Sequence, residues 1–330
     1  MARRVEELGG DYVRVATFHS ACARFLRTDG HLLGFASDFS IYDTQDRDSL
    51  IKELMADMHV SPQEARPSMI GGMISKLKNA AMTPGDGLLS GSDIGRLVER
   101  LWQPYHDRMR KASAMDFDDL LGNFLLILRE HPQVAERYQE RFPWLLVDEF
   151  QDTNEIQYKI IKLLTGEKGK AFIVGDDDQS IYRWRGANPD SMPRFRSDFP
   201  EPRSIKLEQN YRSTKNILNA ANSIIANNAG RLEKNLWTDE ESGPLLKLHQ
   251  NFDEYEEARN IVETIESKSG KLKLSDIAVL YRSNAQSRVI EEALLRKSVP
   301  YRVYGGFRFF DRAEVKDALA YLRSTQNVAD

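Results

Sequence analysis

The sequence predicts a chain of the α/β class, built from parallel sheets with crossover helices and interrupted by an all-helical insertion. Two observations support the α/β assignment: short apolar segments alternate with amphipathic helical patterns, and acidic residues follow directly after two of those segments. The insertion is predicted because residues 28–142 show helical patterns broken by Pro and Gly and no clear strand. A chain of 330 residues exceeds one compact core, so we expect several domains.

The clearest strand and helix signals lie between residues 144 and 176. Residues 144–150 predict a buried strand, and residues 154–164 predict a helix, because their isoleucines and leucines recur at helical spacing. Asp152 or Thr153 is the expected cap of this helix. Residues 170–176 predict the next strand, and the strand-then-helix order recurs from residues 205–207 and from residues 277–282.

Composition excludes several classes of protein. The formal net charge is −4, so a nucleic-acid site must be a local basic track rather than a property of the whole chain. Cys22 is the single cysteine, which excludes an internal disulfide framework and fits a reducing compartment. No apolar run approaches the roughly 18 residues that cross a bilayer, and the N-terminus lacks a secretory signal. We therefore expect no membrane partner and a cytoplasmic protein.

Two adjacent acids end the first predicted strand. Asp148 and Glu149 would lie at the carboxyl end of a parallel strand, where open α/β sheets bind ligands. In nucleotide hydrolysis, one acid at such a place holds Mg²⁺ and its neighbour orients and deprotonates the attacking water. The alternative is an acidic helix N-terminus without chemistry, since carboxylates are favourable there as well.

The segment after the second predicted strand is also rich in polar groups. It contains a glycine turn, three acids and the amide of Gln179, which is suited to sensing a γ-phosphate. Tyr182 and Trp184 follow at once, interleaved with Arg183 and Arg185, a mixture that suits stacking on bases and pairing with phosphates. A core aromatic pair with solvated arginines is the alternative interpretation.

Several segments together resemble the motifs of superfamily 1 DNA helicases of the UvrD, PcrA and Rep type. Motifs II, III and IV are matched by DEFQD (148–152), GDDDQSIYRWRGA (175–187) and QNYRS (209–213). Motifs Ib and Ic are matched by TFHSACARFLR (17–27) and DFDDLL (116–121), and the second motor domain by residues 280–288 and 304–323.

The resemblance implies a fold of incomplete RecA-like P-loop NTPase motor domains with an all-helical inserted domain. Residues 1–27 and 143–208 would form the first motor domain, residues 28–142 the helical insertion, and residues 209–330 the N-terminal part of the second motor domain. It also implies an ATP-dependent DNA helicase and single-stranded DNA translocase, moving 3′ to 5′ in DNA replication or repair. ATP and Mg²⁺ are the implied cofactors. Single-stranded DNA, duplex/single-strand junctions and repair or replication proteins are the implied partners.

The resemblance also implies roles for individual residues. Asp148 would hold Mg²⁺, Glu149 would activate water, and Gln179 would read the γ-phosphate. Tyr211 would stack on adenine, and Arg212 would act as an arginine finger. The DNA-binding residues implied are Thr17, His19, Tyr182, Trp184, Arg185, Arg282 and Asn284. Local alternatives stay open, because His19 also suits a capping or core position and Asn284 a turn.

The glycine-rich phosphate loop of this family, GxxxxGK[ST], does not occur in the 330 residues. We therefore expect an internal fragment of a helicase, without that loop and without the C-terminal motifs. Such a fragment should hydrolyse ATP very slowly by itself and should expose a hydrophobic sheet edge, which favours self-association. A non-hydrolysing module that binds single-stranded DNA or a protein is the alternative function.

Overall fold

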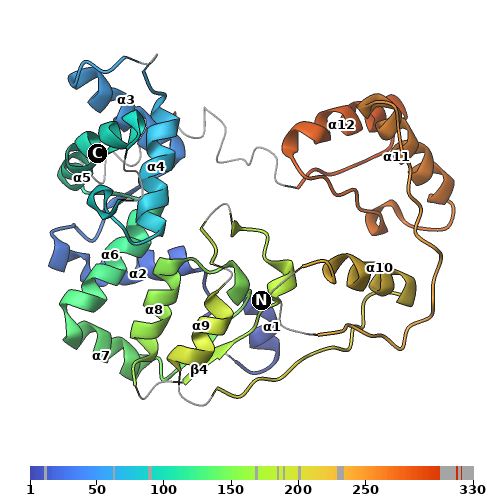
Figure 1. The fold of residues 1–330 in the computed structure, drawn as a ribbon, viewed down its shortest axis with the longest axis horizontal. Helices are drawn as coiled ribbons and strands as arrows, with labels where there is room; N and C mark the ends of the chain where they lie inside the picture. Colours follow the sequence, from blue (N-terminus) through green and yellow to red (C-terminus); the bar gives the residue numbers. More distant parts are fainter. Residues whose placement is uncertain are drawn as a thin grey trace. The chain divides into compact units, whose positions relative to one another are not determined.

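The computed structural model describes residues 1–10, 13–61, 64–87, 91–167, 170–183, 186–188, 190–199, 202–228, 234–304, 317–318 and 321. Its residue contacts group into two compact units. Unit 1 comprises Met1–Lys206 with Asn228 and Tyr321, and unit 2 comprises Leu207–Asn227 with the described residues of Lys234–Ala320 (Figure 1). Within the described ranges, no helix is both long and apolar enough to cross a membrane.

Unit 1 contains a parallel β-α-β arrangement. Its elements are β3 (Trp144–Val147), α8 (Glu155–Thr165) and β4 (Lys170–Ile173). The two strands pair in parallel, with Trp144 opposite Lys170 and Val147 opposite Ile173. The predicted strands and helix are confirmed, although both strands are shorter than expected.

The cap of α8 differs from the prediction. Asn154 is the N-cap residue, and its side chain accepts a hydrogen bond from the Gln157 N–H while Gln157 Oε1 accepts one from the Asn154 N–H. Asp152 instead ends a short 3-10 turn, η3 (Phe150–Asp152), and the Thr153 hydroxyl donates to the Phe150 carbonyl. The tight turn after the strand therefore moves the start of the helix beyond both predicted caps.

The β3–β4 sheet is buried on one face only, so the prediction of a buried first strand is wrong for the other face. Val147 is 6% exposed and packs in a core with Phe150 and Phe195. Side chains alternate along a strand, and the opposite face carries Leu146, which is 67% exposed, and Phe172, which is 55% exposed. The exposed apolar surface observed is a face of the sheet, and the predicted hydrophobic sheet edge stays a prediction. Self-association stays a prediction.

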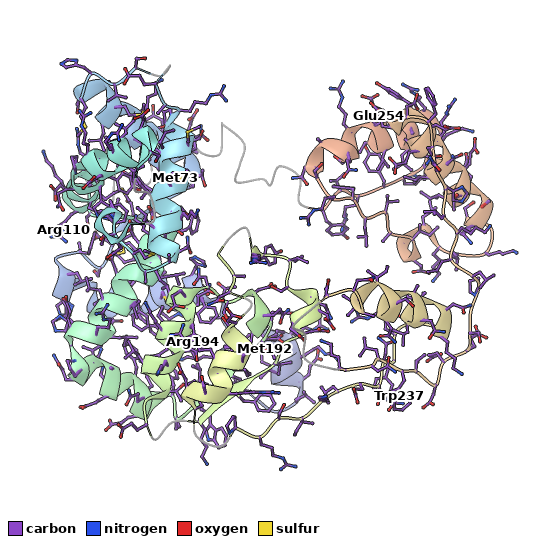
Figure 2. The ribbon with its side chains drawn as sticks, in the orientation of Figure 1. Met73, Arg110, Met192, Arg194, Trp237 and Glu254 are labelled. Atoms are coloured by element: carbon purple, nitrogen blue, oxygen red, sulfur yellow. The ribbon has the colours of Figure 1, made fainter. Side chains whose placement is uncertain are left out.

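The helix α9 (Ser191–Asp198) packs beside α8 on the covered side of this sheet. Arg194 of α9, labelled in Figure 2, donates from Nη1 to Glu155 Oε2 of α8 at 2.7 Å. The guanidinium also lies 4.4 Å from the centre of the Tyr158 ring. These contacts join the segment that follows β4 to the crossover helix.

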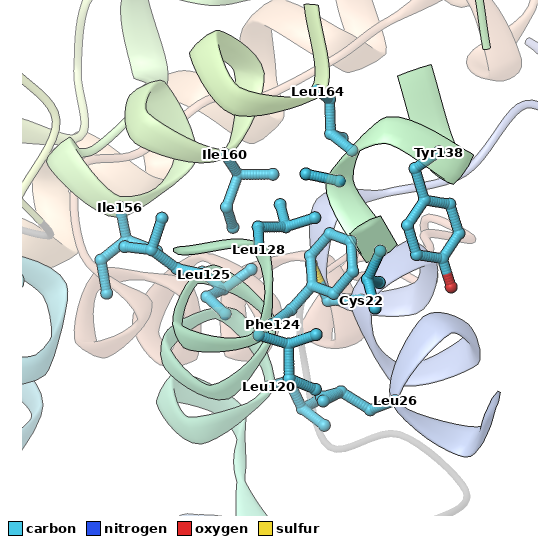
Figure 3. Close-up of a cluster of buried hydrophobic side chains, with 14 of the residues drawn as sticks. Cys22, Leu26, Leu120, Phe124, Leu125, Leu128, Tyr138, Ile156, Ile160 and Leu164 are labelled. Atoms are coloured by element: carbon cyan, nitrogen blue, oxygen red, sulfur yellow. The ribbon is translucent and has the colours of Figure 1, made fainter. Parts of the chain in front are cut away.

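The largest core of unit 1 joins helices that are distant in sequence (Figure 3). They are α2 (Phe18–Asp29), α6 (Phe117–Glu130), α7 (Pro132–Arg141) and α8. Leu26, Phe124, Leu128 and Ile160 are among their buried side chains. Helices α6 and α7 lie in the range predicted to be an insertion, yet they pack with α2 and α8, and the domain boundaries at 27 and 142 stay predictions.

A second core is formed by the helices α3 (Thr44–Asp57), α4 (Pro67–Asn79) and α5 (Asp93–Lys111). The range 28–142 is not entirely helical, because β1 (Ser40–Tyr42) and β2 (Ala114–Asp116) pair in parallel within it. The expectation of no strand there is therefore wrong. Strands of three residues are too short to leave a periodic pattern in the sequence.

The described part of unit 2 contains the helices α10 (Lys215–Ile225), α11 (Glu254–Lys268) and α12 (Ser287–Arg296). Val262, Ile265 and Leu294 form its small core between α11 and α12. The described structure assigns no strand to residues 205–207 or 277–282, so these two predictions are wrong. An apolar segment becomes a strand only when a neighbour supplies its ladder of hydrogen bonds, and local sequence does not specify that neighbour. The remaining described helix, α1 (Ala2–Glu7), precedes α2.

Candidate functional site

The candidate site begins where β3 ends. Asp148 and Glu149 follow Val147 directly and are both exposed. Glu149 adopts a left-handed conformation, with φ 51° and ψ 43°. Such a conformation costs a residue other than glycine about 1–3 kcal/mol and persists where surrounding contacts impose it. The turn therefore presents the Glu149 carboxylate at a strained position on the carboxyl end of the sheet.

The side chain of Gln151 connects the turn that carries Glu149 to the loop that follows β4. Its side chain is buried, and Nε2 donates to Glu149 Oε2 at 2.7 Å. Its Oε1 accepts from the Asp176 N–H at 2.9 Å. Sequence reasoning did not single out Gln151. The signal that could have found it is an amide side chain placed between Glu149 and Asp152 in the DEFQD segment.

The loop after β4 completes the connection. A side chain at Gly175 would place its Cβ 2.8 Å from Gln151 Oε1, so only glycine allows this close approach. Asp176 Oδ2 accepts from Gln179 Nε2 at 2.8 Å. Glu149 and Gln179 are therefore joined through Gln151 and Asp176, although they are far apart in the sequence.

The carboxylates at this edge suit a hard divalent cation. The side-chain oxygens of Asp176, Asp177 and Asp178 lie within 4.8 Å of one another, and Asp148 lies at the end of the neighbouring strand. Mg²⁺ prefers carboxylate oxygen and water ligands, so the donor chemistry fits the predicted ion. Asp152 also faces this region. Burial, and then the charge of Glu149, raise the pKa of its carboxyl.

The segment after Gln179 returns along the start of α8. Tyr182 is 37% exposed, and its carbonyl accepts from the Ala187 N–H. Ala187 pairs with Asn154 in an antiparallel bridge, and the Asn188 N–H donates to the Thr153 carbonyl at 3.0 Å. Tyr182 is therefore exposed, and the alternative of a core aromatic pair is wrong for this residue. The predicted DNA-binding residues Trp184 and Arg185 lie outside the described residues.

Two further predicted DNA-binding residues lie at the start of α2. Thr17 is the N-cap, and its hydroxyl oxygen accepts from the Ser20 N–H at 3.3 Å. His19 is partly buried, and its ring centre lies 6.1 Å from that of Phe117 in an edge-on contact. Burial lowers the pKa of His19, and the nearby charge of Asp118 opposes this shift. His19 is thus not the capping residue.

The predicted residues of unit 2 lie on its surface. Tyr211 is 78% exposed, and its hydroxyl donates to Gln209 Oε1 at 2.6 Å. Arg212 is exposed, and its backbone N–H donates to Asn210 Oδ1 at 2.9 Å. Both residues therefore sit in a turn ordered by polar neighbours.

Arg282 and Asn284 are exposed at the turn that precedes α12. The Arg282 backbone N–H donates to Gln286 Oε1 at 2.9 Å, and Asn284 begins the 3-10 turn η7 (Asn284–Gln286). The alternative interpretation of Asn284 as a turn residue is therefore correct for its backbone. Its predicted contact with DNA stays a prediction.

Acidic groups at the carboxyl ends of two paired parallel strands are typical of α/β proteins that bind a ligand at this edge. Family models give the particular class. The model of the UvrD/REP helicase N-terminal domain matches residues 1–200, and the model of the UvrD-like helicase C-terminal domain matches residues 205–330. The chain belongs to the UvrD/Rep helicase family, which confirms the resemblance found in the sequence.

Curated relatives agree with this assignment. The chain is 42% identical over 347 residues to ATP-dependent DNA helicase UvrD1 of Mycobacterium tuberculosis, covering 100% of the chain and 45% of the relative. It is 42% identical to ATP-dependent DNA helicase PcrA of Staphylococcus epidermidis, covering 100% of the chain and 46% of the relative. It is 45% identical to DNA helicase II of Escherichia coli, covering 96% of the chain and 44% of the relative. The chain therefore spans about half the length of these relatives.

Proposed function

We propose that the protein carrying this chain is an ATP-dependent DNA helicase that translocates 3′ to 5′ along single-stranded DNA during replication or repair. Family membership and the names of the relatives support the proposal. The structural observation that carries it is the side chain of Gln151, which binds both Glu149 and the loop of Gln179. A cytoplasmic location, where such a protein would meet DNA, remains part of the proposal.

Glu149 is the proposed general base for water. Its carboxylate is exposed, and its position is set by the strained turn and by the hydrogen bond from Gln151. A carboxylate held in this way orients a water molecule and accepts its proton. Asp148 would hold Mg²⁺, which when bound supplies positive charge beside the phosphates of ATP. Gln179 would contact the γ-phosphate with its exposed amide.

The DNA contacts are proposed for surfaces of both units. In unit 1, Tyr182, Trp184 and Arg185 would stack on bases or bind phosphates, because aromatic and guanidinium groups do so without sequence preference. The other proposed DNA-binding residues are Thr17, His19, Arg282 and Asn284. For the nucleotide, Tyr211 would stack on adenine and Arg212 would stabilise charge in the transition state. The domain boundaries predicted above are part of the same proposal.

The test of the hydrolytic site is Glu149→Gln in the complete gene product. The substitution keeps size and removes the basic carboxylate, so DNA-stimulated ATP hydrolysis should fall by about 100-fold or more. Nucleotide binding should persist, because the amide remains polar and the proposed contacts of Asp148 with Mg²⁺ and of Gln179 with the γ-phosphate are unchanged. Glu140→Gln on α7, at another exposed acid, is the matched control and should behave as wild type. Full activity in the Glu149 variant would reject the assignment of the base.

The 330 residues taken alone have a second candidate function, binding single-stranded DNA without hydrolysis. The observation that favours it is the lack of a GxxxxGK[ST] loop in this sequence, whose amides and lysine would hold the β- and γ-phosphates. We propose that ATP hydrolysis by the 330 residues alone is very slow. Titration of labelled single-stranded DNA at two salt concentrations tests the binding, because phosphate contacts weaken steeply with salt. Lack of binding at low salt would exclude this function.

A further inference from the structure

Asn79 is the last residue of α4, and its side chain reaches two other elements. Nδ2 donates to Asp118 Oδ1 at the start of α6 at 2.8 Å and to the Ser75 carbonyl at 2.9 Å. Its Oδ1 accepts from Asn154 Nδ2 at 2.6 Å. Both N–H groups and the oxygen of the amide are thus engaged. Replacement by almost any other side chain would break at least one of these connections.

Asn154 lies where two loops of the candidate site meet. It follows the acidic turn, and its Oδ1 caps α8. Its Nδ2 donates a hydrogen bond to Asn79 Oδ1. The segment that carries Tyr182 returns to the same point, because Ala187 forms a backbone bridge with Asn154. Gly186 has φ +90°, and a Cβ there would lie 3.7 Å from the Asn79 Cβ and 3.9 Å from the Asn154 Cβ. The returning segment therefore packs directly on this pair of asparagines.

Asp118 connects the same amide to the start of α2. Hydrogen bonds from Ser75 and Asn79 hold its carboxylate, although burial raises its pKa. His19, one of the proposed DNA-binding residues, makes an edge-on ring contact with Phe117, the residue before Asp118, with ring centres 6.1 Å apart. Lys78, the residue before Asn79 in α4, forms ion pairs with Asp116 and Asp119. These ion pairs attach α4 to the start of α6.

We propose that Asn79 is a positioning residue that couples the proposed DNA-binding surface to the proposed hydrolytic turn. It touches neither nucleotide nor DNA in this role. Asn79 binds Asp118, which follows the Phe117 that contacts His19. It also binds Asn154, which lies between the turn of Glu149 and the segment of Tyr182, and so fixes the position of one relative to the other. This inference rests on the proposed helicase function, and it names the contact through which DNA at unit 1 stimulates ATP hydrolysis.

Two variants break the connection at different ends. Asn79→Asp replaces the amide N–H donors with a carboxylate oxygen facing Asp118, so repulsion replaces a hydrogen bond. Asn154→Ser keeps a good helix cap, because serine accepts from the same N–H groups, but loses the amide that reaches Asn79. Gln103→Glu is the matched control: Gln103 Nε2 donates to Asp107 Oδ1 at 2.8 Å on the exposed face of α5, away from the site.

The measurement is steady-state ATP hydrolysis by the complete gene product, with and without single-stranded DNA. Asn79→Asp and Asn154→Ser should each lower the DNA-stimulated kcat by about 2- to 30-fold, the range expected for residues that carry coupling. The unstimulated kcat and the KM for ATP should stay within about 2-fold of wild type. The double variant should lose no more than the worse single variant, because each substitution interrupts the same connection, one at Asp118 and the other at Asn154. The control should match wild type.

Equal loss of the stimulated and the unstimulated kcat would show that Asn79 has only a structural role, and this would overturn the inference. Unchanged stimulation by DNA in both variants would also overturn it. If Asn79→Asp does not fold, Asn154→Ser alone tests the inference, because serine preserves the N-cap of α8. A failure of the proposed function would be detected by a different variant. If the proposed function is wrong, Glu149→Gln retains ATP hydrolysis, whatever the result for the asparagine variants.

Discussion

Lys78 is the cation of a buried polar cluster, and its replacement by methionine should destabilise the region of α4, α5 and α6. Nζ lies 2.7 Å from Asp116 Oδ2 and 2.7 Å from Asp119 Oδ1, and the three side chains are 6%, 5% and 8% exposed. Tyr105 Oη donates to Asp116 Oδ2 at 2.7 Å. Lys78→Met leaves these buried carboxylates without their cation, which costs about 3–5 kcal/mol of unfolding free energy.

The loss should depend on pH in a defined direction. In the wild type, burial opposes ionisation of Asp116, but the charge of Lys78 outweighs it and lowers the pKa. The stabilisation that results is present above the ordinary aspartate pKa and is lost as pH falls through the lowered value. Burial and the charge of Asp116 already raise the pKa of Asp119 to about 7 in the wild type. Without Lys78, the pKa values of both carboxyls rise further in the folded state. The folded variant then binds protons more readily than the unfolded variant, so its loss of stability relative to the wild type becomes smaller as pH falls toward the ordinary aspartate pKa.

Hydrogen exchange by mass spectrometry, read on peptides from α4, α5 and α6, measures this loss without assuming that the whole chain unfolds together. A loss of about 3–5 kcal/mol corresponds to exchange faster by about 100- to 4,000-fold. Lys76→Met, at an exposed position of the same helix, is the control and should change the free energy by less than about 0.5 kcal/mol. Equal exchange in the two variants, or a deficit that does not narrow in acid, would refute the reasoning.

Two further predictions concern the candidate site and its sheet. Gln151→Met should lower DNA-stimulated ATP hydrolysis of the complete gene product by about 10- to 100-fold, because Glu149 loses the amide that positions it. Gln133→Met, at an exposed position of α7, is its control, and equal rates in the two variants would contradict the prediction. In the 330-residue chain, Val147→Thr should cost about 1–3 kcal/mol by burying a hydroxyl, whereas Leu146→Thr on the exposed face should cost less than about 0.5 kcal/mol. Thermal unfolding of the two variants measures this, and a larger loss for Leu146→Thr would mean that this face is covered.

Local features of the structure could be predicted because neighbouring residues determine them. The helix after the acidic turn is confirmed, since its buried Ile156 and Ile160 follow helical periodicity and a capping residue precedes it. The position of Asp148 and Glu149 at the end of a parallel strand was also predictable, because an apolar run followed by acids specifies both the strand and its end. The motif segments identified the family, which the family models confirm.

Features that depend on distant residues could not be predicted in the same way. The short pair β1 and β2 joins segments more than 70 residues apart, and no pattern of three residues specifies such a partner. Burial of one face of β3 is decided by α8 and α9, so the apolar run alone suggested burial on both faces. The same holds for the absent strands at 205–207 and 277–282, where extended apolar segments lack a described neighbour.

The amino-acid sequence by itself determined the family, the acidic turn and the helix that follows it, because these depend on residues close together in the chain. Only the tertiary structure showed that Gln151 joins Glu149 to the loop of Gln179, and that Asn79 reaches Asn154. A hydrogen bond between side chains requires both partners to arrive within about 3 Å with suitable geometry. That meeting is decided by the packing of whole helices and strands, which no single segment encodes.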